Sequence, residues 1–175
     1  MFAWAEVPLE MPIDTAKQAL ELAVADGGLI GESRRAISQG RAFVVAVGPR
    51  GSQGIAKEVV VRVVRGRSIG DSYLMALRWE VPGVAGKLFP ALDANLALSA
   101  LGPASSELRL LGSYRPPLGK FGGSLDRAAL ARVASATAKA FLNDVAAHLA
   151  KLAAAQTLDV VPDGDPPEAQ ARTTA

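Results

Sequence analysis

The sequence predicts an α+β protein in which one long C-terminal helix lies along an antiparallel sheet of about six strands. Residues 124–156 keep an unbroken helical period and contain no Gly or Pro. Between 41 and 115, segments with a period of two follow one another through short, turn-rich connections, which makes them successive antiparallel strands. Because strands and helices do not alternate along the chain, the pattern argues against a doubly wound parallel sheet.

The long helix is the element around which the other segments are arranged. We expect it over 124–156, with Ser124 as its N-cap after Gly122 and Gly123. Its apolar residues recur at steps of three and four and therefore share one stripe: Leu130, Val133, Thr137, Phe141, Val145, His148 and Leu152. A helix of about thirty residues is roughly 45 Å long, so this stripe needs an extended partner surface. The strands are expected to supply it.

The first forty residues are predicted to form one strand followed by two short helices. The strand covers 2–11, and the first helix covers 16–25 and stops before Gly27. The second short helix is expected over 32–38, before Gly40. The apolar face of the first helix is made of these residues: Ala16, Ala19, Leu20 and Ala23.

Five further strands are expected, and their alternation assigns an inner face. They cover 41–48, 57–66, 72–81, 93–101 and 106–115. In the last three, large apolar residues have one parity and most charged residues have the other. We expect the apolar parity to face the long helix: Tyr73, Met75, Leu77, Trp79, Leu96, Leu98, Leu108, Leu110 and Tyr114. Gly112 stands among these bulky residues, which indicates a bulge or the close approach of another element, for which the long helix is a candidate.

Composition restricts the classes of function. The sequence has no Cys and one His, so a disulfide framework, a thiolate nucleophile and a His-rich metal site are excluded, and we expect no metal and no cofactor. A net charge of +2, scattered cations and few aromatic residues argue against a nucleic-acid partner. No apolar run approaches the roughly twenty residues of a membrane span, and the first residues lack the features of a signal peptide. We therefore expect a cytoplasmic protein that is not embedded in a membrane.

The length of 175 residues, half of them apolar, suits one domain followed by a tail. We expect the domain to cover 1–156. Residues 157–175 are acidic and rich in Pro, and no large apolar residue follows Val161. This segment cannot bury enough apolar surface to offset the entropy lost on ordering, so we predict that it is disordered.

A family likeness is carried by residues 88–146. They contain a Leu-Asp-Ala strand, a Gly-x-Tyr-x-Pro-Pro-x-Gly turn and an Arg-Val-Ala helix. With the order of the elements, these motifs resemble the helix-grip fold of the START and Bet v 1-like superfamily, also called SRPBCC. Within it they look like the polyketide cyclase-like members common in actinobacteria. The resemblance covers residues 1 to about 152 and implies a curved antiparallel sheet wrapped around the long helix, with an apolar cavity between them.

What the resemblance implies about function is a ligand-holding module, since members of the superfamily bind lipids, sterols, polyketides or aromatic metabolites. We expect a small hydrophobic ligand between the helix and the inner parity of the sheet. On the sheet side, the nine residues assigned to the inner face would line the site. The helix would add these residues: Val133, Thr137, Phe141, Val145 and His148.

Two alternatives from other classes stay open. A minority of the superfamily catalyse cyclisation or dehydration, in which case His148, Tyr73 or Tyr114 would transfer protons. His148 is the candidate with an ordinary pKa near neutrality, although a half-buried place at the end of the apolar stripe is the ordinary interpretation of such a residue. The other alternative is a protein-interaction or assembly module, and we expect a monomer or a homodimer.

Overall fold

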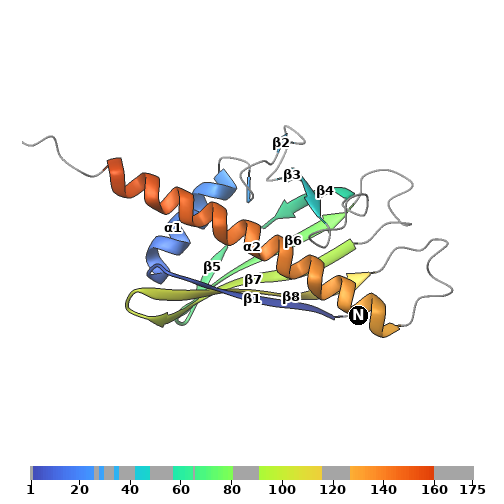
Figure 1. Cartoon of the computed structure of the whole chain (residues 1–175). Coiled ribbons are helices and arrows are strands. Elements are labelled where there is room, and N and C mark those ends of the chain that lie inside the picture. Colours follow the sequence, from blue (N-terminus) through green and yellow to red (C-terminus); the bar gives the residue numbers. More distant parts are fainter. Residues whose placement is uncertain are drawn as a thin grey trace, which may run out of the picture.

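The computed structural model of the chain describes two helices and one sheet (Figure 1). The described residues are 2–25, 28–29, 34–35, 42–47, 57–64, 66–80, 91–115 and 127–159. Side chains are not described at 34–35, 42–47, 57–59, 127, 129–130, 133 and 158–159.

Within the described residues, eight strands form a single antiparallel sheet. They are β1 (Phe2–Leu9), β2 (Arg34–Arg35), β3 (Ala42–Val47), β4 (Lys57–Val63), β5 (Arg67–Ile69), β6 (Ser72–Glu80), β7 (Ala91–Gly102) and β8 (Ser105–Arg115). Their order in the sheet is β1-β8-β7-β6-β4-β3-β2, and β5 pairs with β6 beside this path. Every pairing is antiparallel. The antiparallel sheet expected from short connections is therefore confirmed.

The six strands predicted from the period of two are present, and two shorter ones join them. The added strands are β2 and β5, of two and three residues. The second short helix expected over 32–38 is wrong at Arg34 and Arg35, because these residues form β2 and pair with Val44 and Phe43 of β3. A two-residue strand has no apolar period of its own, and its pairing partner decides its conformation.

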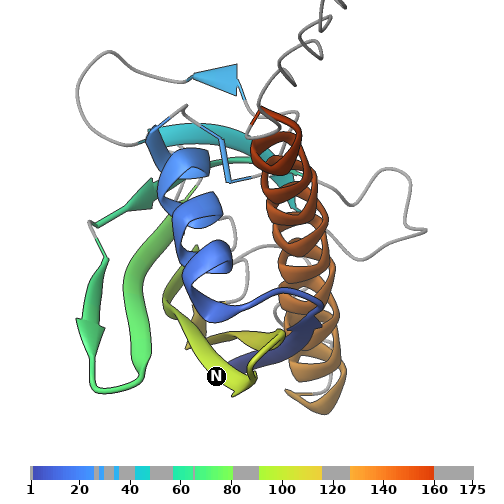
Figure 2. The same cartoon turned by 90° about the vertical axis from the view of Figure 1, so that its left-hand side faces the viewer.

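Two helices lie on the same side of the sheet, which curves around them (Figure 2). They are α1 (Ile13–Ala25) and α2 (Arg127–Asp159), and they contact each other. The long helix α2 runs along the length of the sheet and packs mainly against β1 and β8 (Figure 1). The α+β class with a long C-terminal helix on a curved antiparallel sheet is thus confirmed.

Local hydrogen bonds hold α1 in place at both ends. The N–H group of Gly28 donates to the carbonyl oxygen of Ala23 at 2.9 Å, a bond of the type that closes a Schellman helix end. Before the helix, the buried Ser106 hydroxyl of β8 donates to the carbonyl oxygen of Met11 at 2.9 Å. The connection from β1 to α1 is therefore tied to the strand next to β1.

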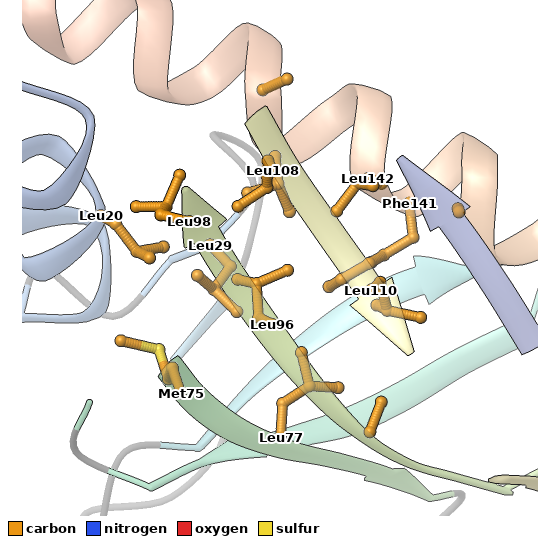
Figure 3. Packing of buried hydrophobic residues seen from close by; sticks show 14 of the residues in the cluster. Leu20, Leu29, Met75, Leu77, Leu96, Leu98, Leu108, Leu110, Phe141 and Leu142 are labelled. Atoms are coloured by element: carbon orange, nitrogen blue, oxygen red, sulfur yellow. The ribbon is translucent and has the colours of Figure 1, made fainter. Parts of the chain in front are cut away.

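The core lies between the sheet and the two helices (Figure 3). Leu20 of α1 and Phe141 and Leu142 of α2 point toward leucines of β6, β7 and β8 in this view. The predicted apolar face of α1 is confirmed, since Ala16, Ala19, Leu20 and Ala23 are all buried, together with Val24. On the other side of α2, Arg132, Ser135, Lys139 and Lys151 are exposed, whereas Asn143 is partly covered.

The helix α2 continues three residues beyond the expected domain boundary at Gln156. The hydroxyl of Thr157 donates to the carbonyl oxygen of Ala153 at 3.1 Å in this last turn. The expected N-cap at Ser124 and the rest of the tail, 160–175, lie outside the described residues. The disordered tail therefore stays a prediction. Within the part of the chain that the structure describes, no helix is both long and apolar enough to cross a membrane.

Candidate ligand-binding site

The register of the sheet arranges most of its inward-pointing side chains in four rows that cross the strands. We call this surface the inner face. From the α1 end, the first two rows are large: Tyr73, Leu98, Leu108 and Val7, then Met75, Leu96, Leu110 and Ala5. The third row is Val63, Leu77, Ala94, Gly112 and Ala3, and the fourth is Val61, Trp79, Leu92 and Tyr114. None of these seventeen residues is charged, so the inner face is apolar apart from the polar tips of its aromatic residues.

The third row contains three small neighbours, Ala3, Gly112 and Ala94, on adjacent strands. We call them the small row. Alanine and glycine fill little of the space above a sheet. The space over the small row is filled either by close approach of α2, as expected at Ala3 on β1, or by another group. The expectation that Gly112 lies close to another element is confirmed, but the element is β7 rather than the long helix. A Cβ atom at Gly112 would lie 2.4 Å from the Cβ atom of Ala94.

The helix α2 covers the inner face with two adjacent rows of side chains. One row was predicted: Thr137, Phe141 and Val145 are buried, while the side chain of Val133 lies outside the described residues. The second row is also buried and was missed, mainly because its members are small: Ala134, Ala138, Leu142, Ala146 and Leu149. Alanine has no strong preference for core or surface, so the helical period alone does not assign it to either.

Trp79 and Phe141 join the sheet to α2. Their ring centroids lie 5.2 Å apart with an interplanar angle of 67°, an edge-to-face contact. Trp79 is 1% exposed, and its indole Nε1 atom has no hydrogen-bond partner among the described residues. Every other buried side-chain nitrogen or oxygen among the described residues has one. The indole N–H group is therefore the polar group of this site that the described part of the chain leaves unsatisfied.

Tyr73 and Tyr114 lie at opposite ends of the inner face. Tyr73 is in the first row, and Tyr114 is in the fourth row together with Trp79. Trp79 follows Tyr73 by six residues along β6, so the two rows are about 20 Å apart. The ring of Tyr73 lies under Lys17 of α1, whose Nζ atom is 5.3 Å from the ring centroid, and its hydroxyl packs against Gly66. Burial raises the pKa of the Tyr114 hydroxyl, which stays neutral at physiological pH. The two tyrosines cannot act on the same reacting atom.

His148 sits two turns after Phe141 on α2, about 10 Å along the helix axis. Its side chain is partly exposed, between the buried Val145 and Leu149. The structure therefore places His148 toward the end of the site and not beside Trp79. Within the described residues, no three acidic or His side chains gather as they would in a metal site.

The charged side chains of the central strands lie on the outer face of the sheet. Arg78 bonds Glu80 at 3.2 Å and Asp93 at 3.5 Å, and Arg62 pairs with Glu80. Arg109 pairs with Glu107 on β8. The predicted separation of apolar and charged parities is therefore found in these strands.

Sequence analysis missed part of the inner face. The predicted strand begins at Asp93, but β7 begins at Ala91 and Leu92 is fully buried. Val61 and Val63 were not assigned to a face, since the valine run of β4 has both parities apolar. The pairing of Val61 with Trp79 settles their orientation.

Comparison with solved structures identifies the fold. A conserved protein from Geobacillus kaustophilus superposes with a TM-score of 0.57 at 13% sequence identity, over 86% of this chain and 96% of that chain. The structure of Ara h 8.0201 gives a TM-score of 0.51 at 10% identity, over 86% of this chain and 98% of that chain. The chain has the helix-grip fold of the START and Bet v 1-like superfamily.

A solved aromatase/cyclase, Zhui from Streptomyces sp. R1128, gives a TM-score of 0.47 at 13% identity, over 86% of this chain and 94% of that chain. No protein-family model matches the sequence, and no curated protein matches it. At such low identities the helix-grip likeness shows the fold alone.

Proposed function

We propose that the protein binds a small hydrophobic molecule, such as a lipid, polyketide or aromatic metabolite, between the inner face of the sheet and α2. The observation that carries the proposal is the small row, Ala3, Gly112 and Ala94, which lies between two rows of large apolar residues. In the neighbouring fourth row, α2 places one large aromatic side chain, Phe141, against Trp79. A change of its rotamer would open an apolar space walled by leucines and Trp79.

The charge distribution supports an apolar ligand. The described inner face has no charged side chain, and the ion pairs of Arg78 and Arg109 lie on the opposite face. An ionised group on a ligand would lose its hydration without gaining a partner charge. A ligand of this site is therefore expected to be mostly apolar and uncharged.

Mass spectrometry of the natively purified protein tests the proposal most directly. Organic extraction of the folded protein should release one apolar compound, or a narrow series, in an amount comparable to that of the protein. If repeated extractions are empty and the protein binds none of a panel of apolar aromatic probes, the proposal is wrong.

A pair of variants locates the site. Ala94→Leu adds three carbon atoms to the small row, so it should lower probe affinity at least tenfold by filling the space. Ala76→Leu adds the same atoms on the exposed outer face of the neighbouring β6 and serves as the matched control. Isothermal titration with an aromatic probe measures both. Equal affinities for the two variants would place the ligand elsewhere.

Self-assembly is a second candidate, favoured by the edge strand β1. Phe2 and Trp4 are 78% and 54% exposed on this strand, and Trp4 pairs with Leu111, which is 53% exposed. Apolar side chains on an open edge favour pairing with a second copy of the same strand. Light scattering at micromolar concentration should then give a homodimer that Trp4→Glu converts to a monomer. A monomer in both cases removes this candidate.

A cyclase or dehydratase activity stays the alternative from another class. Because Tyr73 and Tyr114 are far apart, a reaction at the small row would have to use Tyr114 without Tyr73. Turnover of any substrate that survives Tyr114→Phe and His148→Ala would rule out both as proton donors. A cytoplasmic location and the absence of a nucleic-acid partner stay predictions from composition.

A further inference from the structure

The unsatisfied indole of Trp79 restricts the chemistry of the ligand. Its Nε1 atom is buried and has no hydrogen-bond partner in the part of the chain that the structure describes. An indole N–H group is a donor only, so the missing partner must be an acceptor. Buried polar groups without a partner are rare and destabilising, and where one occurs in a binding site a bound group is the natural partner.

The side chains around Trp79 do not supply the acceptor. Its neighbours in the fourth row are Val61 and Leu92, and across the interface it meets the ring of Phe141. The polar groups nearest in the register and on α2 are the hydroxyls of Tyr114 and Thr137, and neither bonds Nε1. The acceptor must therefore come from outside the described part of the chain.

We propose that the ligand carries a neutral oxygen, as in a ketone, ester, amide or alcohol, which accepts a hydrogen bond from Trp79 Nε1. This inference rests on the proposed binding of a hydrophobic molecule at the small row. The oxygen is neutral because the inner face offers no cation to a carboxylate or phosphate, and one neutral donor does not offset the desolvation of an anion.

Entry of the oxygen requires a side chain to move. The Nε1 atom has almost no accessible surface, so the acceptor replaces a group that packs against the indole. Phe141 is the group in edge-to-face contact, and it projects from α2 toward the sheet (Figure 3). Rotation of the Phe141 ring away from Trp79 would make space for a ligand. An aromatic ligand could then lie over the small row with its oxygen at the Nε1 atom of Trp79.

The test compares two probes that differ in one oxygen, 9-fluorenone and fluorene. The sequence has two Trp residues, and Trp4 is half-exposed on the outer face of β1. Trp4→Phe therefore leaves a protein with one indole and an unchanged site. In its ¹⁵N–¹H spectrum, fluorenone should move the Trp79 indole proton downfield and slow its exchange with water. Fluorene should do neither.

Affinities provide a second, independent measurement. In the Trp4→Phe protein fluorenone should bind more tightly than fluorene, and Trp79→Phe should weaken fluorenone about fivefold to tenfold, the usual effect of one lost hydrogen bond. The same substitution should change the affinity for fluorene much less, because only packing is altered. If Trp79→Phe does not fold, the indole proton in the Trp4→Phe protein decides the question alone.

The outcomes separate this inference from the proposed function. If both probes bind equally well and the indole proton responds equally to both, the site is apolar as proposed. Trp79 then donates no hydrogen bond to a ligand oxygen, and the inference is wrong. An indole proton that is already hydrogen-bonded and protected in the ligand-free protein would show a buried water as the partner, which also overturns it. If neither probe binds, nor any other apolar probe, the proposed function itself fails.

Discussion

Gly112 shows how one residue controls the spacing of two strands. A Cβ atom there would lie 2.4 Å from the Cβ atom of Ala94 and 2.5 Å from the carbonyl oxygen of Asp93. Real Cβ atoms do not approach backbone atoms so closely, and the Asp93 oxygen cannot rotate away as a side chain can. Glycine is therefore required at this point of β8 by its pairing with β7, and a side chain would push the two strands apart.

Gly112→Ala is accordingly expected to destabilise the protein by about 1–3 kcal/mol, the range for overpacking a well-packed interior. Gly102→Ala is the matched control, because a Cβ atom there would meet only the Ser105 hydroxyl oxygen, at 3.3 Å. Urea denaturation of both variants measures the free energy of unfolding. A smaller loss for Gly112→Ala than for Gly102→Ala would contradict the tight contact between β7 and β8.

Tyr114 is expected to make the free energy of unfolding depend on pH in the alkaline range. Burial raises its pKa above the ordinary value of 10.0, so above pH 10 the unfolded chain loses a proton that the folded protein keeps. The stabilisation of the neutral phenol is present below pH 10 and is lost as the pH rises through the folded-state pKa. Tyr114→Phe should reduce the fall in unfolding free energy between pH 9 and 11. Parallel curves for the two proteins would show that Tyr114 is not the group responsible.

At the scale of elements, small side chains let α2 approach β1. Ala134 and Ala138 of the helix are buried, as are Ala3 and Ala5 of the strand. Helix and strand are in extensive contact, and the Nζ atom of Lys139 donates to the carbonyl oxygen of Glu6 at 3.2 Å. The helix therefore lies close over the edge strand, and its lysine partly covers the open edge.

Ala138→Leu should lower the free energy of unfolding by about 1–3 kcal/mol, since Ala138 is 0% exposed and its neighbours leave no room for three more carbon atoms. Ala147→Leu, on the exposed side of the same helix, controls for helix propensity. Thermal or urea unfolding measures the loss of stability in both variants. An effect of the same size at both positions would mean that α2 is not closely packed against the strands.

At the scale of the whole molecule, the domain is one layer of sheet closed by one layer of helices. Leucines of β6, β7 and β8, leucines of α1 and α2, and Phe141 belong to one continuous core. No described side chain of this core lies beyond Ala153. The end of α2 therefore adds little to the packing that holds the sheet and helices together.

Truncation after Gln156 should consequently change the free energy of unfolding by less than about 1 kcal/mol, the usual range of surface changes. It removes the exposed hydrogen bond from Thr157 to Ala153 along with the predicted disordered tail. Truncation after Asp159 keeps that bond and separates the two contributions. A larger loss from either truncation, or loss of a bound ligand, would show that the tail is an integral part of the fold.

Sequence alone determined the elements whose own residues set their conformation. The alternation in β6, β7 and β8 assigned Tyr73, Met75, Leu96 and Leu108 to the inner face, and the period of α2 assigned Phe141 and Val145 to the core. These patterns are local, because a side chain points inward or outward according to the period of its own segment. The superfamily resemblance named the fold that the long helix and the antiparallel strands build together.

Tertiary structure decided what depends on contacts between distant segments. Arg34 and Arg35 form a strand because β3 pairs with them, and Gly112 is small because β7 passes beside it. The row of Ala134 and Ala138 is buried because the strand facing it also has alanines, which no helical period reveals. In the same way the small row and the unsatisfied Trp79 Nε1 arise only when four strands and α2 meet, because a row across a sheet joins residues that are up to about a hundred positions apart in sequence.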